Sequence, residues 1–548
     1  MKKNKIIRNF LIGLAAVAAL GVYYYVTIPA INIHSSGTWG AIFLVIGILM
    51  LFSLVKHFKG NVESTVEGIS KMQFRIKDTS LMFKILGSVM LLLCVVYGIG
   101  YLLSSPFFNA AKYQKLLSIE ERNFTDDIKE VDYQTIPLLD KDSAAILGNR
   151  KMGSMVDMVS QFEVTSDYSQ INYLGKPVRV TPLTYASPIK WLTNQRNGIP
   201  AYILIDMTTQ DTECVKLTEG IKYSKGEYFN RNIYRHLRFK FPTYIFAEQI
   251  FFEIDDEGIP YWVCPVKKFN IGLFGGQTIG RVVLCNAQTG ECTDYAVEDV
   301  PTWIDKVYSA ELLIDLYDYS GLLKHGYWNS LLGQKDCLQS TNGYNYIALD
   351  DDVWVYTGVT SVSGDQSNVG FVLMNQRTME TRYYKVEGAI EDSAMSSAEG
   401  QVQNLGYRAT FPLLLNIADE PTYFMALKDS AGLVKKYAMV NVQKYQWVAI
   451  GDTLKECEKN YTELLNTNGI VSSLAEELKS ITGQIKSISP IVLEGNTHYY
   501  ICLENGDDIF DLDMQDKSLI QIVKYQVGDR IVFEYLNEYG INQVKSIK

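Results

Sequence analysis

The chain has 548 residues, of which 47% are hydrophobic and 20% are charged. This length exceeds one ordinary domain, and this apolar content excludes an intrinsically disordered chain. The formal net charge of −10 argues against a nucleic-acid partner, because binding to phosphates needs a basic surface.

Charge is distributed unequally along the chain. Residues 1–104 contain ten Lys and Arg but three Asp and Glu, whereas the whole chain contains 51 basic and 61 acidic residues. A basic beginning and an acidic remainder indicate two different environments.

Three apolar runs occupy the basic segment, at 10–28, 39–55 and 81–103. Each approaches the roughly 20 residues that a helix needs to cross the hydrocarbon core of a lipid bilayer. We therefore predict that 1–104 is a membrane anchor of three transmembrane helices. A cleaved signal peptide is the alternative for the first run, but its apolar residues continue without a convincing cleavage site.

The basic residues also predict the orientation of the anchor. Lys and Arg precede the first run and recur between the second and third runs, whereas the connection at 29–38 has none. Because positively charged loops stay in the cytoplasm, we expect the amino terminus inside the cell and residues 105–548 outside it. The predicted location is the cell membrane, which the chain crosses several times.

Seven of the eight cysteines follow the anchor, and an odd number does not suggest a disulfide framework. Cys285 and Cys292 flank a predicted hairpin turn and could face each other across it. The favoured interpretation is that both are small, half-buried strand residues, and whether they pair stays open. The sequence has no C-x-x-C, so zinc binding has no support.

One pattern occurs three times without gaps, at 204–217, 284–297 and 373–386. It reads L-x-[DN]-x-x-T-x-[DE]-x-x-x-[YV]-x-[VL]. An apolar strand leads to an Asp or Asn whose side chain starts a turn, and alternating residues return as a second strand. Each copy is predicted to be a β-hairpin that turns near the Thr. The leucines expected in equivalent positions are Leu204, Leu284 and Leu373.

The sequences after the first and third copies correspond further. Each contains a Tyr-Arg pair, then Phe-Pro, apolar strands and an Asp-x-x-Gly turn. Apolar residues at 391–405 have helical spacing. Residues 105–450 are therefore predicted to be an α+β region with two related lobes, at about 170–300 and 340–450.

A helix, a twisted hairpin and the pattern V-L-x-N-A-x-T-G-E resemble the PepSY domain, a small extracytoplasmic module of bacterial envelope proteins. The best match is Tyr261-Trp-Val263 followed by 282–291. The whole chain also resembles multi-span membrane proteins of Firmicutes. This resemblance implies that the two lobes are PepSY-like, and such modules are thought to restrain peptidases or to aid envelope assembly.

Beyond the lobes, 451–482 is predicted to be a helical linker, with helices at 452–465 and 471–481. Residues 483–548 hold four or five short strands separated by turns, which predicts a small OB-like β-barrel. Such barrels can bind nucleic acid, but an acidic neighbour outside the cell argues against that role. The predicted fold class is α+β, with three N-terminal transmembrane helices, duplicated PepSY-like helix/β-hairpin lobes and a small C-terminal barrel.

Known catalytic motifs are missing from the sequence. The glycine loop at 272–280 lacks the Lys-Ser/Thr of a phosphate-binding loop, and G-x-S-x-G does not occur. Acidic residues at 350–352 and 508–516 lack the spacing of a calcium loop, so we interpret them as solvated turns. The five histidines contain no i, i+4 pair. We therefore predict no catalytic residue, no cofactor and no metal site.

The leading functional prediction is a non-enzymatic, membrane-anchored binding or scaffold protein of the cell envelope, which modulates a peptidase or wall enzyme. The alternatives are an envelope hydrolase with an acidic site between the lobes and a membrane sensor that signals through 56–80. Aromatic and Arg side chains dominate interfaces, although each Arg could instead hold a turn. The candidate partner-binding residues are Tyr234, Arg235, Tyr407 and Arg408.

Overall fold

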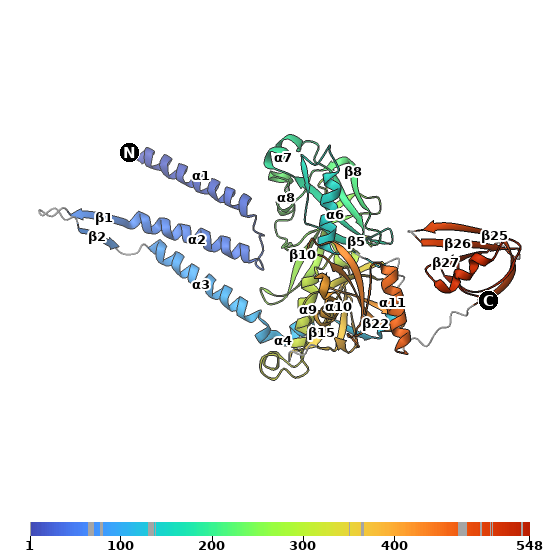
Figure 1. The fold of residues 1–548 in the computed structure, drawn as a ribbon. Helices are drawn as coiled ribbons and strands as arrows, with labels where there is room; N and C mark the ends of the chain where they lie inside the picture. Colours follow the sequence, from blue (N-terminus) through green and yellow to red (C-terminus); the bar gives the residue numbers. More distant parts are fainter. Residues whose placement is uncertain are drawn as a thin grey trace. The chain divides into compact units, whose positions relative to one another are not determined.

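The structure is a computed structural model that consists of two compact units, Met1–Glu458 and Lys459–Lys548. Figure 1 shows its helices and strands and labels many of them. The residues that it describes are 2–63, 71–76, 81–129, 136–137, 139–349, 351–362, 367–469, 479–493, 496–504, 506, 508–538 and 541–548.

Two helices near the amino terminus are long and apolar enough to cross a membrane. They are α2 (Ser36–His57), through Ser36–Ser53, and α3 (Leu81–Leu103). None of the α3 side chains is buried, so the helix presents an apolar surface that water solvates poorly. Its bounds match the third predicted span.

Of the three spanning helices that the sequence predicts, the described residues support two, α2 and α3. The first apolar run falls in α1 (Lys2–Thr27), but its apolar part among the described side chains is Gly13–Thr27. That length is below the roughly 17 residues of the shortest spanning helices. Residues 10–12 of the predicted run lie outside the described side chains.

Short elements connect the helices to the rest of the chain. An antiparallel hairpin joins α2 to α3, and a helix and a strand follow α3. These elements are β1 (Phe58–Glu63), β2 (Lys71–Ile76), α4 (Pro106–Gln114), β3 (Ile119–Arg122) and α5 (Phe124–Asp127).

Four groups then follow, each with a helix and a sheet of mainly consecutive, antiparallel strands. The sheet of the third group also contains β3, which joins it as a parallel edge strand. The first group is α6 (Lys141–Gly153), β4 (Phe162–Val164), β5 (Ser169–Tyr173), β6 (Lys176–Tyr185), α7 (Pro188–Asn194), β7 (Ile199–Asp206) and β8 (Thr212–Ile221). The second is η2 (Phe229–Arg231), α8 (Ile233–Lys240), β9 (Phe251–Ile254), β10 (Pro260–Ile271), β11 (Gly275–Asn286), β12 (Cys292–Ala296) and η3 (Val297–Asp299).

The third and fourth groups repeat this order of helix and strands. The third is α9 (Ala310–Leu322), η4 (Asn329–Gly333), β13 (Leu338–Ser340), β14 (Asn345–Leu349), β15 (Asp352–Ser361), β17 (Gly370–Asn375) and β18 (Thr381–Tyr384), with β16 (Ser367–Asn368) paired to β19 (Gly388–Ala389). The fourth is α10 (Glu391–Gln401), η5 (Gln403–Leu405), β20 (Arg408–Ala409), β21 (Leu413–Ile417), β22 (Glu420–Lys428), β23 (Val434–Asn441) and β24 (Val448–Gly451).

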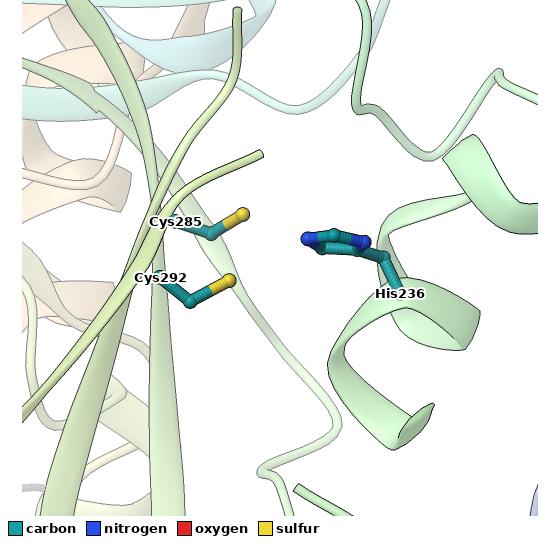
Figure 2. Close-up of side chains that lie close together, drawn as sticks. All are labelled: His236, Cys285 and Cys292. Atoms are coloured by element: carbon teal, nitrogen blue, oxygen red, sulfur yellow. The ribbon is translucent and has the colours of Figure 1, made fainter. Parts of the chain in front are cut away.

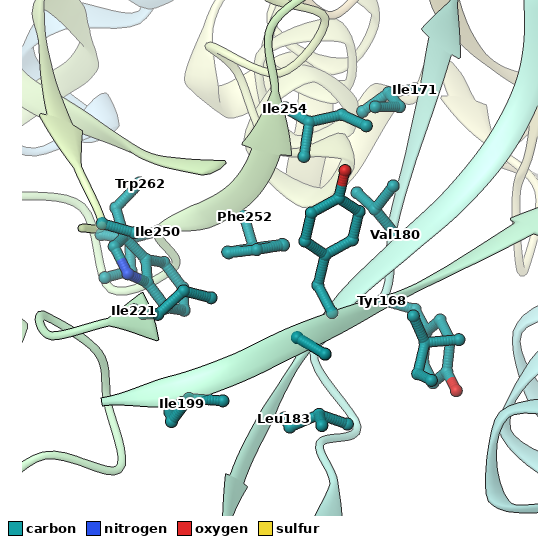
Figure 3. Packing of buried hydrophobic residues seen from close by; sticks show 14 of the residues in the cluster. Tyr168, Ile171, Val180, Leu183, Ile199, Ile221, Ile250, Phe252, Ile254 and Trp262 are labelled. Atoms are coloured by element: carbon teal, nitrogen blue, oxygen red, sulfur yellow. The ribbon is translucent and has the colours of Figure 1, made fainter. Parts of the chain in front are cut away.

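The sheet of the second group is buried on both faces. Trp262, Cys264 and Cys285 face a core that this sheet shares with the first group, part of which Figure 3 shows. Val263 and Leu284 face a second core, which includes α9 and the sheet of the third group. Burial on both faces explains why these strands are continuously apolar rather than alternating.

The three predicted hairpins are confirmed, and they share one register. In each, the Leu of the pattern lies opposite the residue nine positions later. The pairs are Leu204 with Glu213, Leu284 with Thr293, and Leu373 with Arg382.

The turns of these hairpins are also alike. The Oδ1 atom of Asp206, Asn286 or Asn375 accepts hydrogen bonds from the N–H groups two and three residues later, at 2.8–3.0 Å. A fourth hairpin, β23–β24, uses Asn441 in the same way, at 3.0 and 2.8 Å. Its loop is one residue longer, since Val440 lies opposite Val448, and a gapless comparison misses it.

The two Asp-x-x-Gly turns do not correspond in the fold. The turn at Asp255 joins the first strand of its group, β9, to β10, whereas the turn at Asp429 joins β22 to β23. Both Asp side chains accept from N–H groups two and four residues later. The motif encodes a local turn and does not mark an equivalent place in two lobes.

The C-terminal strands close into a barrel in the order β25–β26–β27–β29–β28. All neighbours are antiparallel except β27 and β29. Ile485, Phe510 and Phe533 are among the residues that fill its interior. The elements are β25 (Lys479–Leu493), β26 (Asn496–Leu503), β27 (Ile509–Asp513), η6 (Lys517–Lys524), β28 (Arg530–Glu538) and β29 (Ile541–Ile547).

The predicted helical linker at 451–482 is partly wrong. Its first helix is present as α11 (Leu454–Thr467), but residues 479–482 belong to β25, and 470–478 lie outside the described residues. Ile481 pairs with Phe533 of β28, so a strand partner far along the chain overrides the local helical spacing.

Candidate ligand-binding cleft

A cleft of about 500 Å³ lies between the first two sheet groups and the last two. The start of α6, strands β5, β6 and β9, the start of α9 and strand β14 contribute to its walls. This volume suits a small molecule or a short peptide segment. The runner-up prediction of a site between the lobes therefore has a cavity at the expected place.

Two basic side chains of the cleft are buried. Arg179 is 5% exposed, and its guanidinium donates to the carbonyl oxygen of Leu139 (3.3 Å) and to Oε1 of Gln170 (3.2 Å). Lys306 is 6% exposed, and its Nζ lies 4.6 Å from the ring centre of Tyr346. Across the residues that the structure describes, neither cation forms an ion pair with a carboxylate. A buried cation that no direct ion pair neutralises is costly, so the two cations favour a ligand of negative charge.

Three of the four acidic side chains in the cleft already have partners. Burial raises the pKa of Asp140, but hydrogen bonds from Lys428 and Ser143 bring that pKa below its ordinary value. A carboxylate held in this way is a poor general base, because its proton affinity is low. The engaged pairs are Asp140 with Lys428, Asp167 with Lys225 (3.1 Å), and Glu311 with the hydroxyl of Tyr344 (2.8 Å).

Two polar atoms in the lining are buried without a hydrogen-bond partner among the described residues. They are the hydroxyl of Tyr168 and Oε1 of Gln376. Burial raises the pKa of Tyr168 to about 12, so its hydroxyl keeps a proton to donate. Both atoms have almost no exposed surface, so they belong to the packing behind the cleft surface and are not contacts for a ligand.

A pair of buried carboxyl groups lies behind the cleft wall. Glu253 has no exposed surface and accepts from the N–H groups of Asp305 and Lys306, both at 3.0 Å. Burial raises the pKa of Glu253 to about 7, and burial together with Glu253 raises that of Asp305. Since Glu253 cannot reach a ligand, its role is to position the loop that carries Lys306.

The acidic run at 350–352 is structural where it is described. Asp350 lies outside the described residues. Asp351 accepts from the side-chain amide of Asn172 at 2.6 Å. Asp352 is 6% exposed and forms an ion pair with Arg377 at 2.6 Å, so the interpretation as a solvated turn is wrong for this residue. The pair ties the start of β15 to the turn after β17.

Of the candidate partner-binding residues, Tyr234 and Arg235 lie in α8. Tyr234 is half-buried against the core of the first two groups. The guanidinium of Arg235 donates to the carbonyl oxygens of Tyr25 (3.2 Å) and Phe229 (2.7 Å) and lies 4.4 Å from the Tyr25 ring centre. Arg235 therefore binds the end of α1, whose last carbonyl groups have no partner within the helix.

Tyr407 and Arg408 lie in a different setting. Arg408 begins β20, and its guanidinium forms an ion pair with Glu399 at 2.8 Å while its side chain stays 83% exposed. Tyr407 is half-buried. The two Tyr-Arg pairs are not structurally equivalent, because one is helical and the other begins a strand.

The glycine loop between β10 and β11 docks on the end of α3. The N–H groups of Leu273 and Phe274 donate to Oγ of Ser104 at 2.8 and 3.0 Å, and the rings of Phe274 and Tyr97 lie 5.0 Å apart. Gly272 has a φ of 60°, and a Cβ there would come within 2.5 Å of Ser104 Oγ. The loop is the connection of a β-hairpin, and its contact with Ser104 requires a glycine at position 272.

A cluster that the sequence analysis missed joins β11, β12 and α8. Cys285 and Cys292 face each other, and His236 lies beside them. The predicted hairpin register already implied the facing cysteines. His236 gave no local signal, because it comes from a helix that only the tertiary fold brings to this sheet.

No family model matches the chain, and no curated protein matches it. The similarity to PepSY modules therefore rests on the quoted sequence pattern.

Proposed function

We propose that the chain is a membrane-anchored, extracytoplasmic binding protein of the bacterial cell envelope, whose cleft takes a carboxylate-bearing peptide segment of a partner. The observation that carries this proposal is the pair of buried cations, Arg179 and Lys306, beside acids that are mostly engaged. A guanidinium binds a carboxylate through parallel hydrogen bonds. The rings of Tyr168, Phe251 and Tyr346 supply the apolar walls that peptide sites use.

The proposed anchor comprises three transmembrane helices, with the amino terminus in the cytoplasm. The apolar character of α2 and α3 and the length of α1 support this arrangement. The basic residues before the first apolar run and between the second and third support the orientation. The partner is proposed to be a peptidase or wall enzyme, as the likeness to PepSY modules suggests.

The alternative of a hydrolase gains no support from the cleft. Three of the four acidic side chains in the cleft already have partners. The carboxyl of Glu253, whose pKa is raised, is fully buried behind the cleft wall. A membrane sensor is the second candidate, because α8 and the β10–β11 loop bind the ends of α1 and α3 directly. A ligand that shifts the groups around the cleft would then act on the membrane helices.

The experiment uses the intact protein in detergent and a library of synthetic tetrapeptides, each made with a free and with an amidated carboxyl terminus. We expect binding, measured by calorimetry, to require the free carboxylate. Arg179→Met and Lys306→Met should each weaken it by at least about tenfold, the effect of a lost charge-assisted hydrogen bond. Arg196→Met and Lys324→Met, at exposed positions, are the matched controls.

Equal binding of free and amidated peptides would contradict the proposed ligand class. Equal binding by the cleft variants and their controls would place the ligand elsewhere. Turnover of a bound peptide would promote the hydrolase alternative.

A further inference from the structure

The strands β11 and β12 bring two cysteines together. Cys285 lies directly opposite Cys292 in the antiparallel register. The next pair toward the turn is hydrogen-bonded, since the N–H of Asn286 donates to the carbonyl of Glu291 at 2.9 Å. Hydrogen-bonded and non-hydrogen-bonded pairs alternate along an antiparallel ladder. The cysteines therefore occupy a non-hydrogen-bonded pair, in which the Cα atoms are about 4.5 Å apart. This spacing lies within the range that a disulfide bond spans.

A histidine from α8 faces this pair. Figure 2 shows the sulfur atoms of Cys285 and Cys292 and the ring of His236 directed toward one another. The two Sγ atoms and one ring nitrogen lie within 4.8 Å of one another. Nε2 of His236 is 2.7 Å from the carbonyl oxygen of Gly290, and Nζ of Lys240 donates to the same oxygen at 2.8 Å.

The two thiols differ in access and in acidity. Cys285 has no exposed surface, whereas Cys292 is half-buried. A hydrogen bond with Cys285, together with His236 and Lys240, lowers the pKa of Cys292 to about 5. The same hydrogen bond and burial raise the pKa of Cys285. An accessible thiolate beside a buried thiol is the arrangement of an attacking and a resolving cysteine.

The other hairpins show that the fold does not require these cysteines. The positions of Cys285 and Cys292 are occupied by Ile205 and Thr212 in the first hairpin. In the third hairpin they are occupied by Met374 and Thr381. All three hairpins keep the same register and turn, so the paired cysteines are an addition of the second hairpin alone.

The contact of His236 with Gly290 engages the ring nitrogen Nε2. A nitrogen at 2.7 Å from a carbonyl oxygen must carry the proton that bridges them. Nε2 in this state has no lone pair for a metal ion. Its N–H dipole and the ammonium of Lys240 instead stabilise a nearby thiolate.

We propose that Cys285 and Cys292 form a dithiol–disulfide couple that exchanges with external disulfides. With glutathione disulfide as the oxidant, the Cys292 thiolate attacks one sulfur, forms a mixed disulfide and releases one glutathione thiolate. Cys285 then gives its proton to solvent and attacks Sγ of Cys292, which releases the second glutathione thiolate. Two electrons pass from the cysteines to glutathione disulfide.

The test equilibrates the intact protein in detergent with buffers of reduced and oxidised glutathione and maps thiols by mass spectrometry. We expect the peptide that contains Cys285 and Cys292 to become lighter by two hydrogen atoms. Cys285→Ser should trap glutathione on Cys292, whereas Cys292→Ser should trap none on Cys285. Cys214→Ser, at a half-buried position on β8, is the matched control and should behave as wild type.

A second measurement follows the rate of alkylation of Cys292 against pH in the reduced protein. His236→Gln should move the rise of this rate to higher pH and slow it at least about tenfold near pH 6, because the thiolate is the reactive form. A merely structural histidine would leave the profile unchanged. Urea midpoints of all variants check the fold.

Three results would overturn the proposal. One is a Cys285–Cys292 pair that stays reduced across the glutathione series. Another is equal trapping of glutathione on either single variant. The third is one zinc ion per chain that is lost in Cys292→Ser and protects both thiols from oxidation, which would make the cluster a metal centre.

Discussion

Replacing Glu253 by Gln tests the carboxyl pair behind the cleft through the pH dependence of stability. Burial raises the pKa of Glu253 from 4.5 to about 7, against smaller opposing effects of the Asp305 and Lys306 N–H groups and the Lys306 charge. Between these values the unfolded chain has released the proton, whereas the folded chain keeps it. The folded protein therefore loses stability as the pH rises through this window.

The structure gives the size of this effect. Each pH unit changes the free energy of unfolding by about 1.4 kcal/mol per proton, so the window amounts to roughly 3 kcal/mol. The contribution is fully present below pH 4.5 and lost above about pH 7. Asp305 acts in the same direction, because its pKa is raised by burial and by Glu253.

The assay is urea unfolding of the intact chain in detergent at several pH values, followed by tryptophan fluorescence. Trp262 and Trp354 are each 1% exposed and report on the loss of the cores. Glu253→Gln should remove most of the decline in stability between pH 5 and pH 7. Glu257→Gln, on the exposed turn nearby, should keep it. Parallel declines for wild type and Glu253→Gln would refute a protonated, buried carboxyl.

Three further predictions concern the hairpins and the anchor. Asn375→Ala should cost about 1–3 kcal/mol in urea unfolding and more than Asn286→Ala, because Asn375 also donates to Asp352 at 2.8 Å; a larger loss for Asn286→Ala would contradict this. Leu373→Ala should cost about 2–5 kcal/mol, and Leu204→Ala less, since Leu373 is fully buried and Leu204 is half-buried; equal midpoints would argue against this packing. A cysteine introduced near Glu420 should react with an impermeant reagent added outside cells, whereas one near Lys71 should not, and outside labelling near Lys71 would reverse the orientation.

The sequence predicted the hairpins because their cause is local. An Asp or Asn side chain closes each turn, and apolar strands on both sides leave one register that buries Leu284 or Leu373. Short local motifs were, however, a poor guide to which parts of the two predicted lobes correspond. Tyr-Arg and Asp-x-x-Gly recur in the sequence, yet Arg235 is helical and Arg408 begins a strand.

The cleft and the thiol cluster could not be predicted in the same way. Arg179 and Lys306 come from β6 and from the loop before α9, and only the packing of separate sheet groups places them in one cavity. His236 likewise reaches the cysteines through the docking of α8. Such contacts depend on the energies of burial over long sequence separations, which no short pattern encodes.

If α1 and α3 span the membrane as proposed, their contacts with the sheet groups restrict how the proposed partner reaches the cleft. Arg238 donates to the carbonyl of Ile28 at 2.9 Å, and Ser104 binds the loop at Leu273, so the joints are short and hydrogen-bonded. A flexible tether would let the domain sweep a volume that grows with linker length. Without such a tether, the cleft of the proposed membrane-anchored chain would stay at a fixed height above the bilayer and would move only with lateral diffusion of the anchor. The effective concentration of the partner at the cleft is then set by the length of the partner's own tether. A membrane-bound partner whose tether matches the height of the cleft would bind it best.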